Sequence, residues 1–177
     1  MNKKSLPPIS FVLGGAGSGK SFFAENLCDL SGLSKVYLAT SEVWDDETAA
    51  KVSQHKKQRG TGWNTIEEPR DIAGVLFNRH VGEVLLVDCM TLWLTNVILA
   101  EADIDSAIKS ALDALSACAC PVVAVGNEVG QGIVPENALA RRFRNDNGKM
   151  NQTLAATADL VVHVVAGLPQ VLKGALP

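Results

Sequence analysis

Long hydrophobic runs, clustered cysteines and aromatic residues are scarce in this sequence of 177 residues. No run approaches the roughly 20 apolar residues that cross a bilayer, and the apolar run at residues 9–13 is too short for a secretion signal. The cysteines Cys28, Cys89, Cys118 and Cys120 are too scattered for a disulfide framework or a zinc site. We therefore expect a reduced, cytoplasmic protein without a membrane span.

An excess of one charge is also absent, because 16 basic and 19 acidic side chains leave a net charge of −3. Proteins that bind nucleic-acid backbones usually carry a strong basic excess, so we expect no such partner. Aromatic residues make up only 5% of the chain, whereas 15 glycines are present, so tight turns matter more than stacked rings. The apolar fraction of 47% excludes disorder, and the length suits a single domain over residues 1–177.

Strand-like and helix-like segments alternate along the chain. Strands are expected at residues 9–13, 36–39, 84–87, 122–125 and 160–165, and helices at about 20–30, 45–59, 104–118 and 139–158. The turn-forming residues 145–148 leave open an interruption of the last helix, and the residues after 165 are expected to form a tail. Alternation of this kind predicts βαβ units and an α/β fold with a mostly parallel central sheet flanked by helices.

A glycine-rich motif joins the first expected strand to the first expected helix. The residues Gly14-Gly15-Ala16-Gly17-Ser18-Gly19-Lys20-Ser21 match the pattern G-x-x-x-x-G-K-[ST] in full. In such a loop the backbone N–H groups and the helix N-terminus bind phosphates, Lys20 reaches the β- and γ-phosphates, and Ser21 holds Mg²⁺. A glycine-rich turn that matches by chance is the alternative, and the surrounding strand and helix disfavour it.

Asp88 directly follows the strand expected at residues 84–87. This is the place of the carboxylate that assists Mg²⁺ binding in P-loop proteins, so we expect Ser21 and Asp88 to share the metal. The alternative is an aspartate that merely begins a turn. Together these motifs predict a P-loop NTPase (RecA-like) fold that binds ATP or GTP with Mg²⁺, but they leave the acceptor of the phosphoryl group open.

His55 differs from the other two histidines because it lies in a basic run. On a helix, His55 and Arg59 share one face, and Lys56 lies beside them. A neutral imidazole among cations can attack the α-phosphorus of a nucleotide while the cations stabilise the developing charge. From spacing alone, a solvated helix end whose bases complement the helix dipole is the favoured interpretation.

Several further segments accompany these motifs along nearly the whole chain. They are residues 39–41, 45–47 leading to His55, Lys56 and Arg59, then Trp63, 88–96, 127–135, 143–144 through 151–152, 158–159 and 167–169. With them, the sequence resembles the bifunctional adenosylcobinamide kinase/adenosylcobinamide-phosphate guanylyltransferase family of cobalamin biosynthesis. One departure is Gly17, where the P-loop of that family often carries arginine.

The resemblance implies two reactions on one scaffold. A nucleoside triphosphate phosphorylates adenosylcobinamide, and GTP then transfers GMP through guanylylated His55 to adenosylcobinamide phosphate. It also implies a homotrimer with sites between subunits. The implied nucleotide site comprises Gly14 to Ser21, Thr40, Ser41, Glu42, Lys56, Lys57, Gln58, Arg59, Glu67 and Asp88.

Asn127 and Glu128 follow the strand expected at residues 122–125, so they should emerge near bound nucleotide at its carboxyl edge. The glycine-containing loop after them, up to Pro135, is either part of a substrate pocket or a plain connection. Two other functions stay open from the residues alone. One is a small-molecule kinase in which His55 is structural, and the other is a nucleotide switch or ATPase subunit.

Overall fold

The structure, a computed structural model, describes residues 5–42 and 60–177. In chain order its elements are β1 (Ile9–Gly14), α1 (Lys20–Ser31), β2 (Ser34–Ala39), β3 (Trp63–Glu67), α3 (Ile72–Phe77), β4 (Glu83–Asp88), α4 (Met90–Leu99), α5 (Ile104–Ala117), β5 (Val122–Asn127), α6 (Ala138–Thr157), β6 (Leu160–Val165) and β7 (Leu168–Lys173).

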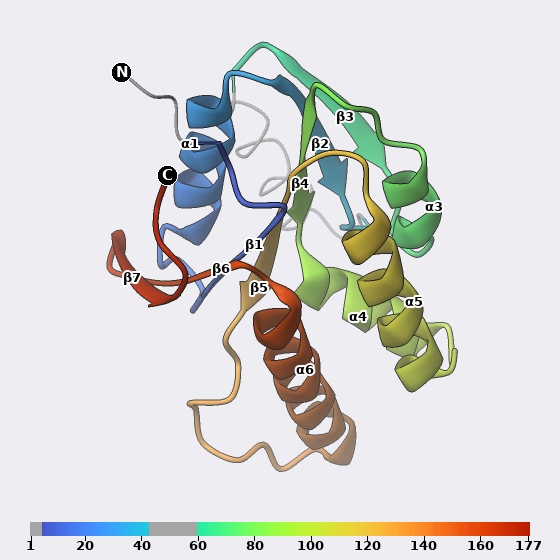
Figure 1. The fold of residues 1–177 in the computed structure, drawn as a ribbon. Coiled ribbons are helices and arrows are strands. Elements are labelled where there is room, and N and C mark those ends of the chain that lie inside the picture. The colour runs from blue at the N-terminus through green and yellow to red at the C-terminus, as the bar shows by residue number, and fades with distance from the viewer. Residues whose placement is uncertain (1–4, 43–59) are drawn as a thin grey trace.

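One seven-stranded sheet organises the molecule, in the order β3-β2-β4-β5-β1-β6-β7. Each neighbouring pair is parallel except β6 and β7, which are antiparallel. Helix α1 covers one face of this sheet, and α3, α4, α5 and α6 cover the other (Figure 1). The predicted α/β fold with a mostly parallel sheet flanked by helices is therefore confirmed.

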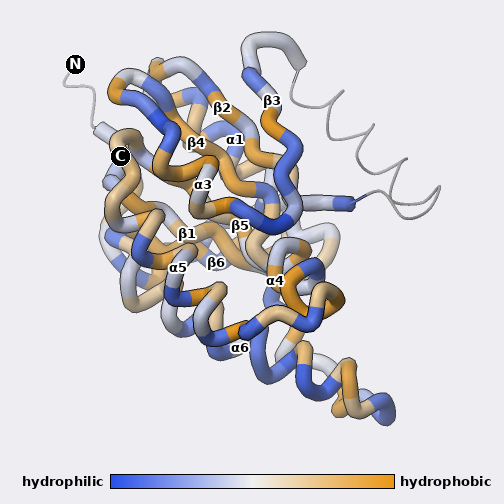
Figure 2. The backbone as a smooth tube through the Cα atoms, turned by 90° about the vertical axis from the view of Figure 1, so that its right-hand side faces the viewer, coloured by the Kyte–Doolittle hydropathy of each residue, from blue (hydrophilic) through white to orange (hydrophobic). Residues whose placement is uncertain are grey.

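Strand β4 shows how the sheet is buried on both sides. Val84 and Leu86 pack with α1, whereas Leu85 and Val87 pack with the helices of the opposite face, and all four are fully buried. Successive strand residues point to opposite faces, so a strand covered on both sides is apolar without alternation. The central strands form the hydrophobic middle of the molecule in Figure 2.

Two expectations about the C-terminal third need correction. Residues 145–148 do not interrupt α6, which runs unbroken from Ala138 to Thr157. The side chain of Asn147 is buried on the inner face of this helix, where its amide donates to Asn127 O at 3.0 Å. The expected tail after residue 165 contains strand β7, which pairs with β6 across a turn at Ala166 and Gly167, both with positive φ. The helix expected at residues 45–59 lies outside the described residues.

Within residues 5–42 and 60–177, no helix is both long enough and apolar enough to span a bilayer. The longest helix, α6, has 20 residues and is largely polar.

Candidate nucleotide site

The loop between β1 and α1 requires glycine at several positions. Gly17 and Gly19 have left-handed backbones, with φ of 68° and 90°. A Cβ on Gly14 would lie 2.5 Å from both Ser18 Oγ and Val164 O, which is closer than carbon and oxygen can approach. Glycine at position 17, where the resembled family often has arginine, therefore suits the observed backbone. The P-loop motif takes the tight curl that its sequence predicts.

Lys20 begins α1 and turns back over this loop. Its Nζ donates a hydrogen bond to Gly15 O at 3.1 Å, and its side chain is half-buried. Ser21 follows in the first turn of the helix, where no acidic side chain neutralises the positive end of the helix dipole. Backbone N–H groups, an ammonium and a helix N-terminus therefore converge on one concave loop, which is the arrangement that binds phosphate.

The turn of the β6–β7 hairpin supports the P-loop from the side. Gly167 N donates to Ser18 O at 2.8 Å, and a Cβ on Gly19 would lie 3.2 Å from Gly167 Cα. The sequence predicts no such contact, because the residues after 165 read as a tail and not as a strand. The only sequence signal for it was the Ala166-Gly167 pair between two apolar residues, which is a weak hairpin signature.

Asp88 ends β4, two strands from β1 in the sheet. Tyr37 Oη donates to Asp88 Oδ2 at 2.9 Å and so orients the half-buried carboxylate. Burial, followed by the charge of Asp88, raises the pKa of the neighbouring Cys89 thiol to about 12, while the charge of Lys20 acts to lower it. Asp88 and the P-loop thus lie at the same carboxyl edge of the sheet, with β5 between their strands.

The oxygen donors at this edge fit Mg²⁺. That ion takes few protein ligands and completes an octahedron with water and phosphate oxygens, so one hydroxyl and one carboxylate suffice. Ser21 and Asp88 are the pair that the sequence predicts for this role. A protein-only centre of three or more His, Cys, Asp or Glu side chains does not occur within residues 5–42 and 60–177.

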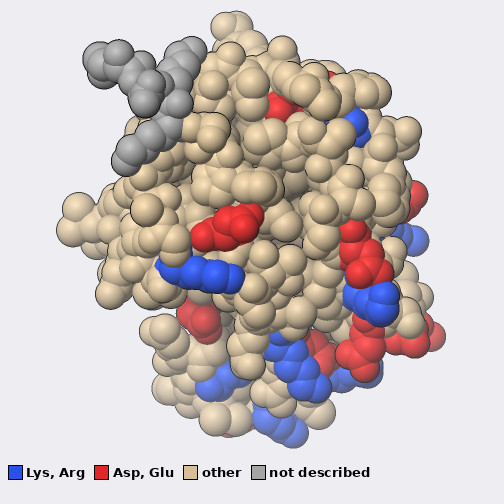
Figure 3. All heavy atoms as spheres, in the orientation of Figure 1, with Lys and Arg blue, Asp and Glu red and all other residues tan. Residues whose placement is uncertain are grey.

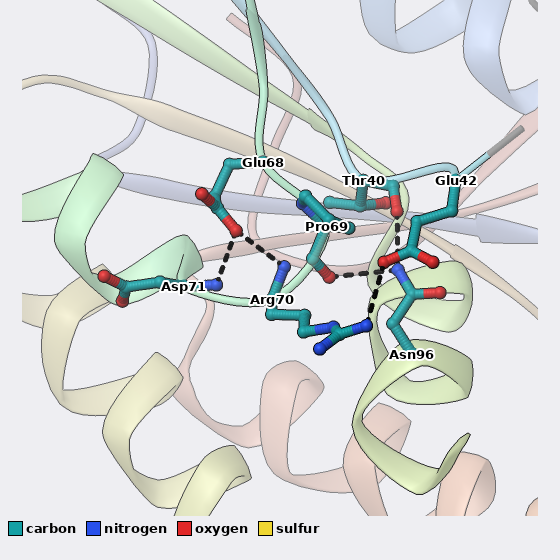
Figure 4. A network of polar contacts seen from close by, with 7 residues as sticks. All are labelled: Thr40, Glu42, Glu68, Pro69, Arg70, Asp71 and Asn96. Carbon is teal, nitrogen blue, oxygen red and sulfur yellow. Dashed lines mark hydrogen bonds and ion pairs between the residues drawn. The ribbon is translucent and has the colours of Figure 1, made fainter. Parts of the chain in front are cut away.

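Thr40 is fully buried and joins β2 to the start of α4. Its hydroxyl donates to Cys89 O at 2.7 Å and accepts from Cys89 N at 2.8 Å. The carbonyl of Thr40 accepts from Asn96 Nδ2 at 2.7 Å, and the same amide donates to Pro69 O at 3.0 Å (Figure 4). Thr40 therefore acts as a positioning residue between the ends of β2 and β4.

Ser41 and Glu42 follow Thr40 and are half-buried. Glu42 Oε1 lies 3.4 Å from Arg70 Nη2, an ion pair visible beside Thr40 in Figure 4. Glu68 accepts from the N–H groups of Arg70 and Asp71 at 2.9 Å each, which holds this turn in place. Sequence reasoning assigned no role to Arg70, because a single exposed arginine carries no signal.

Glu67 ends β3 and is exposed, with Ala39 of β2 as its partner in the sheet register. Ala39 in turn pairs with Asp88. The predicted residues at 40–42, 67 and 88 therefore lie at the carboxyl edge of the adjacent parallel strands β2, β3 and β4, the same edge of the sheet at which β1 leads into the P-loop.

Asn127 and Glu128 complete this edge, as predicted. Asn127 pairs with Gly14 in the sheet, and Glu128 N donates to Gly14 O at 3.1 Å. Asn127 N donates to Thr91 Oγ at 2.8 Å, which ties β5 to α4. The segment after β5 thus begins directly beside the P-loop.

The predicted residues of the basic run lie outside the described part of the chain. They are His55, Lys56, Lys57, Gln58 and Arg59. Their roles in catalysis and nucleotide binding remain predictions.

Comparison with solved structures defines the class of protein. The flagellar accessory protein FlaH from Methanocaldococcus jannaschii superposes with a TM-score of 0.54 at 12% identity, covering 96% of this chain and 80% of that one. The RadB recombinase superposes with a TM-score of 0.53 at 14% identity, covering 90% and 75%. At such identities the likeness concerns the fold alone, and the fold is that of RecA-like P-loop NTPases.

Sequence comparison narrows this class to one family. The model of the family described as cobinamide kinase / cobinamide phosphate guanyltransferase matches residues 10–172. The bifunctional adenosylcobalamin biosynthesis protein CobP of Pseudomonas aeruginosa is 40% identical over 166 residues, covering 92% of this chain and 96% of that protein. The chain belongs to this cobinamide kinase and guanyltransferase family, which confirms the resemblance found in the sequence.

Proposed function

We propose that the protein phosphorylates adenosylcobinamide with ATP or GTP and then transfers GMP from GTP to the new phosphate, giving adenosylcobinamide-GDP. The observation that carries this proposal is the meeting of Lys20, Asp88 and Asn127 at one sheet edge, in a member of a family described by both activities.

The P-loop serves the phosphates of the nucleotide in both reactions. The loop N–H groups and the N-terminus of α1 stabilise negative charge, and Lys20 leaves its hydrogen bond to Gly15 O for a phosphate oxygen. Ser21 and Asp88 would hold Mg²⁺, which neutralises charge on the phosphates. Thr40, Ser41, Glu42 and Glu67 line or support the same edge.

His55 carries the guanylyl group between the two substrates. Its ring nitrogen attacks the α-phosphorus of GTP, the new P–N bond replaces the bond to the bridging oxygen, and pyrophosphate leaves. The phosphate of adenosylcobinamide phosphate then attacks that phosphorus and breaks the P–N bond. Lys56 and Arg59 stabilise the charge on the α-phosphate, and Lys57 and Gln58 complete the nucleotide-binding segment. The family resemblance supports these roles and a homotrimeric assembly.

Labelling with α-³²P GTP tests the covalent step. We expect acid-labile, base-stable label on the protein, as a histidine phosphoramidate gives. His55→Ala should abolish the label and the formation of adenosylcobinamide-GDP, while some phosphorylation of adenosylcobinamide remains. His80→Ala is the matched control, because His80 is an exposed histidine in the turn before β4.

Two other results would redirect the proposal. An active kinase without label would be a small-molecule kinase in which His55 is structural. Loss of both reactions in His55→Ala would mean that His55 mainly positions the nucleotide.

A further inference from the structure

An open pocket lies between α6 and the segment that follows β5, apart from the P-loop. Its volume is about 610 Å³, within the usual range for ligand sites. Arg142, Arg144 and Lys149 line it from the helix, and Gly130 lines it from the segment after β5. Basic side chains gather over this lower part of the molecule in Figure 3.

The charge of this pocket is positive in a protein whose net charge is negative. Asp146 is the acidic member of the lining, and its Oδ2 lies 3.5 Å from Arg142 Nε. That pair offsets the charge of Arg142 and leaves Arg144 and Lys149 to give the pocket its positive character. Asn145 and Gln152 add amide donors to the lining. Guanidinium, ammonium and amide donors together suit a phosphate group.

Arg144 is the best-placed of these cations. Its Nη2 donates to Gly130 O, which orients the guanidinium. Its Nη1 is buried and has no hydrogen-bond partner within residues 5–42 and 60–177. A buried guanidinium N–H without a partner is unfavourable, so a turn of the guanidinium that brings Nη1 to an anionic oxygen in the pocket would be favourable.

The pocket is tied to the P-loop through a short piece of chain. Glu128 N donates to Gly14 O, and Glu128 Oε1 accepts from Gly130 N. Asn127, the register partner of Gly14, is three residues from Gly130, so extended chain separates them by at most about 11 Å. The Gly130 side of the pocket therefore lies within about 11 Å of the strand end that pairs with Gly14 of the P-loop.

The residues that line the pocket suit a phosphate on a large, partly apolar molecule better than they suit a nucleotide. Among the described residues no aromatic side chain lines it, so these residues offer no ring on which a nucleotide base can stack. Three and four residues after Gly130, the segment that follows β5 exposes Ile133 and Val134, with exposed fractions of 97% and 65%. A phosphate head attached to a large, partly apolar body fits this combination of a cationic pocket and an adjacent apolar surface.

We propose that this pocket is the subsite for the phosphate of the phosphorylated corrinoid acceptor, with Arg144 as its principal anchor. The inference rests on the proposed function and adds to it the residues that recognise the second substrate. The unphosphorylated acceptor lacks the group that Arg144 binds, so the pocket favours the intermediate over the first substrate.

Equilibrium dialysis without nucleotide tests this assignment, with corrinoid absorbance as the readout. Adenosylcobinamide phosphate should bind the wild-type protein at least about tenfold more tightly than adenosylcobinamide, since one charge-assisted interaction is worth roughly that factor. Arg144→Met should reduce this preference about tenfold and change binding of adenosylcobinamide less than about twofold. Lys149→Met, at an exposed position, should reduce the preference in the same direction by about threefold.

Arg141→Met is the matched control. Arg141 lies on the same helix and donates to Pro135 O and Glu136 O, but it does not line the pocket. Its loss should weaken both corrinoids alike or neither, leaving the preference unchanged. An unchanged preference in Arg144→Met and Lys149→Met would overturn the assignment, as would equal loss of preference in Arg141→Met, which would indicate loop positioning.

Two further measurements separate this inference from the proposed function. Covalent label from α-³²P GTP should form equally in wild type and Arg144→Met, and binding of a fluorescent GTP analogue should be unchanged. Weaker GTP binding in Arg144→Met would assign the pocket to the nucleotide and overturn the inference. Absence of label in every variant would overturn the covalent mechanism alone, because the phosphate preference is measured without GTP.

Discussion

No sequence motif distinguishes Cys118 and Cys120, but their neighbours in the fold shift the pKa values of the two thiols in opposite directions. Cys118 Sγ lies 3.7 Å from Cys120 Sγ and 3.5 Å from Leu76 O. The hydrogen bond from Cys120 lowers the pKa of Cys118 to about 7, against the opposing effect of burial. The same interaction and burial raise the pKa of Cys120. Cys118 therefore forms a thiolate as the pH rises through about 7, whereas Cys120 stays protonated.

The reactivity of Cys118 should follow this titration. We expect its reaction rate with an aromatic disulfide reagent to rise with pH around a midpoint near 7, because the thiolate is the nucleophile. Cys120→Ala removes the donor and should move the midpoint up toward the ordinary value of 9.0. Cys118→Ala should lose this phase, since Cys28 and Cys89 are buried with raised pKa values. A midpoint unmoved by Cys120→Ala would contradict the assignment.

At the scale of elements, the β1–α1 loop has a backbone conformation that glycine adopts without strain and that other residues rarely adopt. Gly19 has a φ of 90°, and it lies against Gly167 of the β6–β7 turn. A side chain at this position meets both an unfavourable backbone and a neighbouring backbone. Gly15 has neither constraint, because its φ is not positive and a Cβ there would meet no atom within 4 Å.

Gly19→Ala should therefore lower the free energy of unfolding by about 1–3 kcal/mol, the usual cost of a strained residue. Gly15→Ala is the control in the same loop and should change it by less than about 0.5 kcal/mol. Urea denaturation without nucleotide measures both. Equal effects of the two substitutions would show that the loop relaxes around Gly19.

Helices and strands with a regular spacing of apolar residues were predictable from the sequence, and those without such a spacing were not. The strands at 84–87 and 122–125 are apolar runs of strand length, and α5 has regular apolar spacing, so each was found. Strand β7 is exposed at every position, and α3 has only six residues, so neither has a readable period. Helix α4 is mostly buried, and a helix that is apolar on several sides lacks an amphipathic signature.

At the scale of the whole molecule, one phosphate site is proposed to serve both reactions. The P-loop follows β1, and the described segments of the predicted site, which leave out the basic run at 55–59, lie at the same edge of the sheet. In the proposed scheme the order of the reactions follows from the acceptor, which acquires its phosphate in the first step and is recognised by that phosphate in the second.

Lys20→Ala should consequently impair both reactions by about tenfold or more, since a charge-assisted phosphate contact is lost in each. Formation of adenosylcobinamide phosphate measures the first reaction, and covalent label from α-³²P GTP measures the second. Lys109→Ala is the control, because Lys109 is an exposed residue of α5 whose ion pair with Asp113 is far from the P-loop in sequence. Label formation that survives Lys20→Ala would reveal a second nucleotide site.

The sequence by itself determined the α/β class, the P-loop, the strand-terminal Asp88 and the family, because these depend on local patterns of glycine, charge and apolar residues. Tertiary structure decided that the Thr40 hydroxyl donates a hydrogen bond to Cys89 O and that Gly167 N donates one to Ser18 O of the P-loop. It also decided that Arg144 lies in a pocket beside Gly130. Such contacts join residues distant in the chain, and their energies depend on burial and alignment. Only the folded sheet brings those partners within hydrogen-bonding distance.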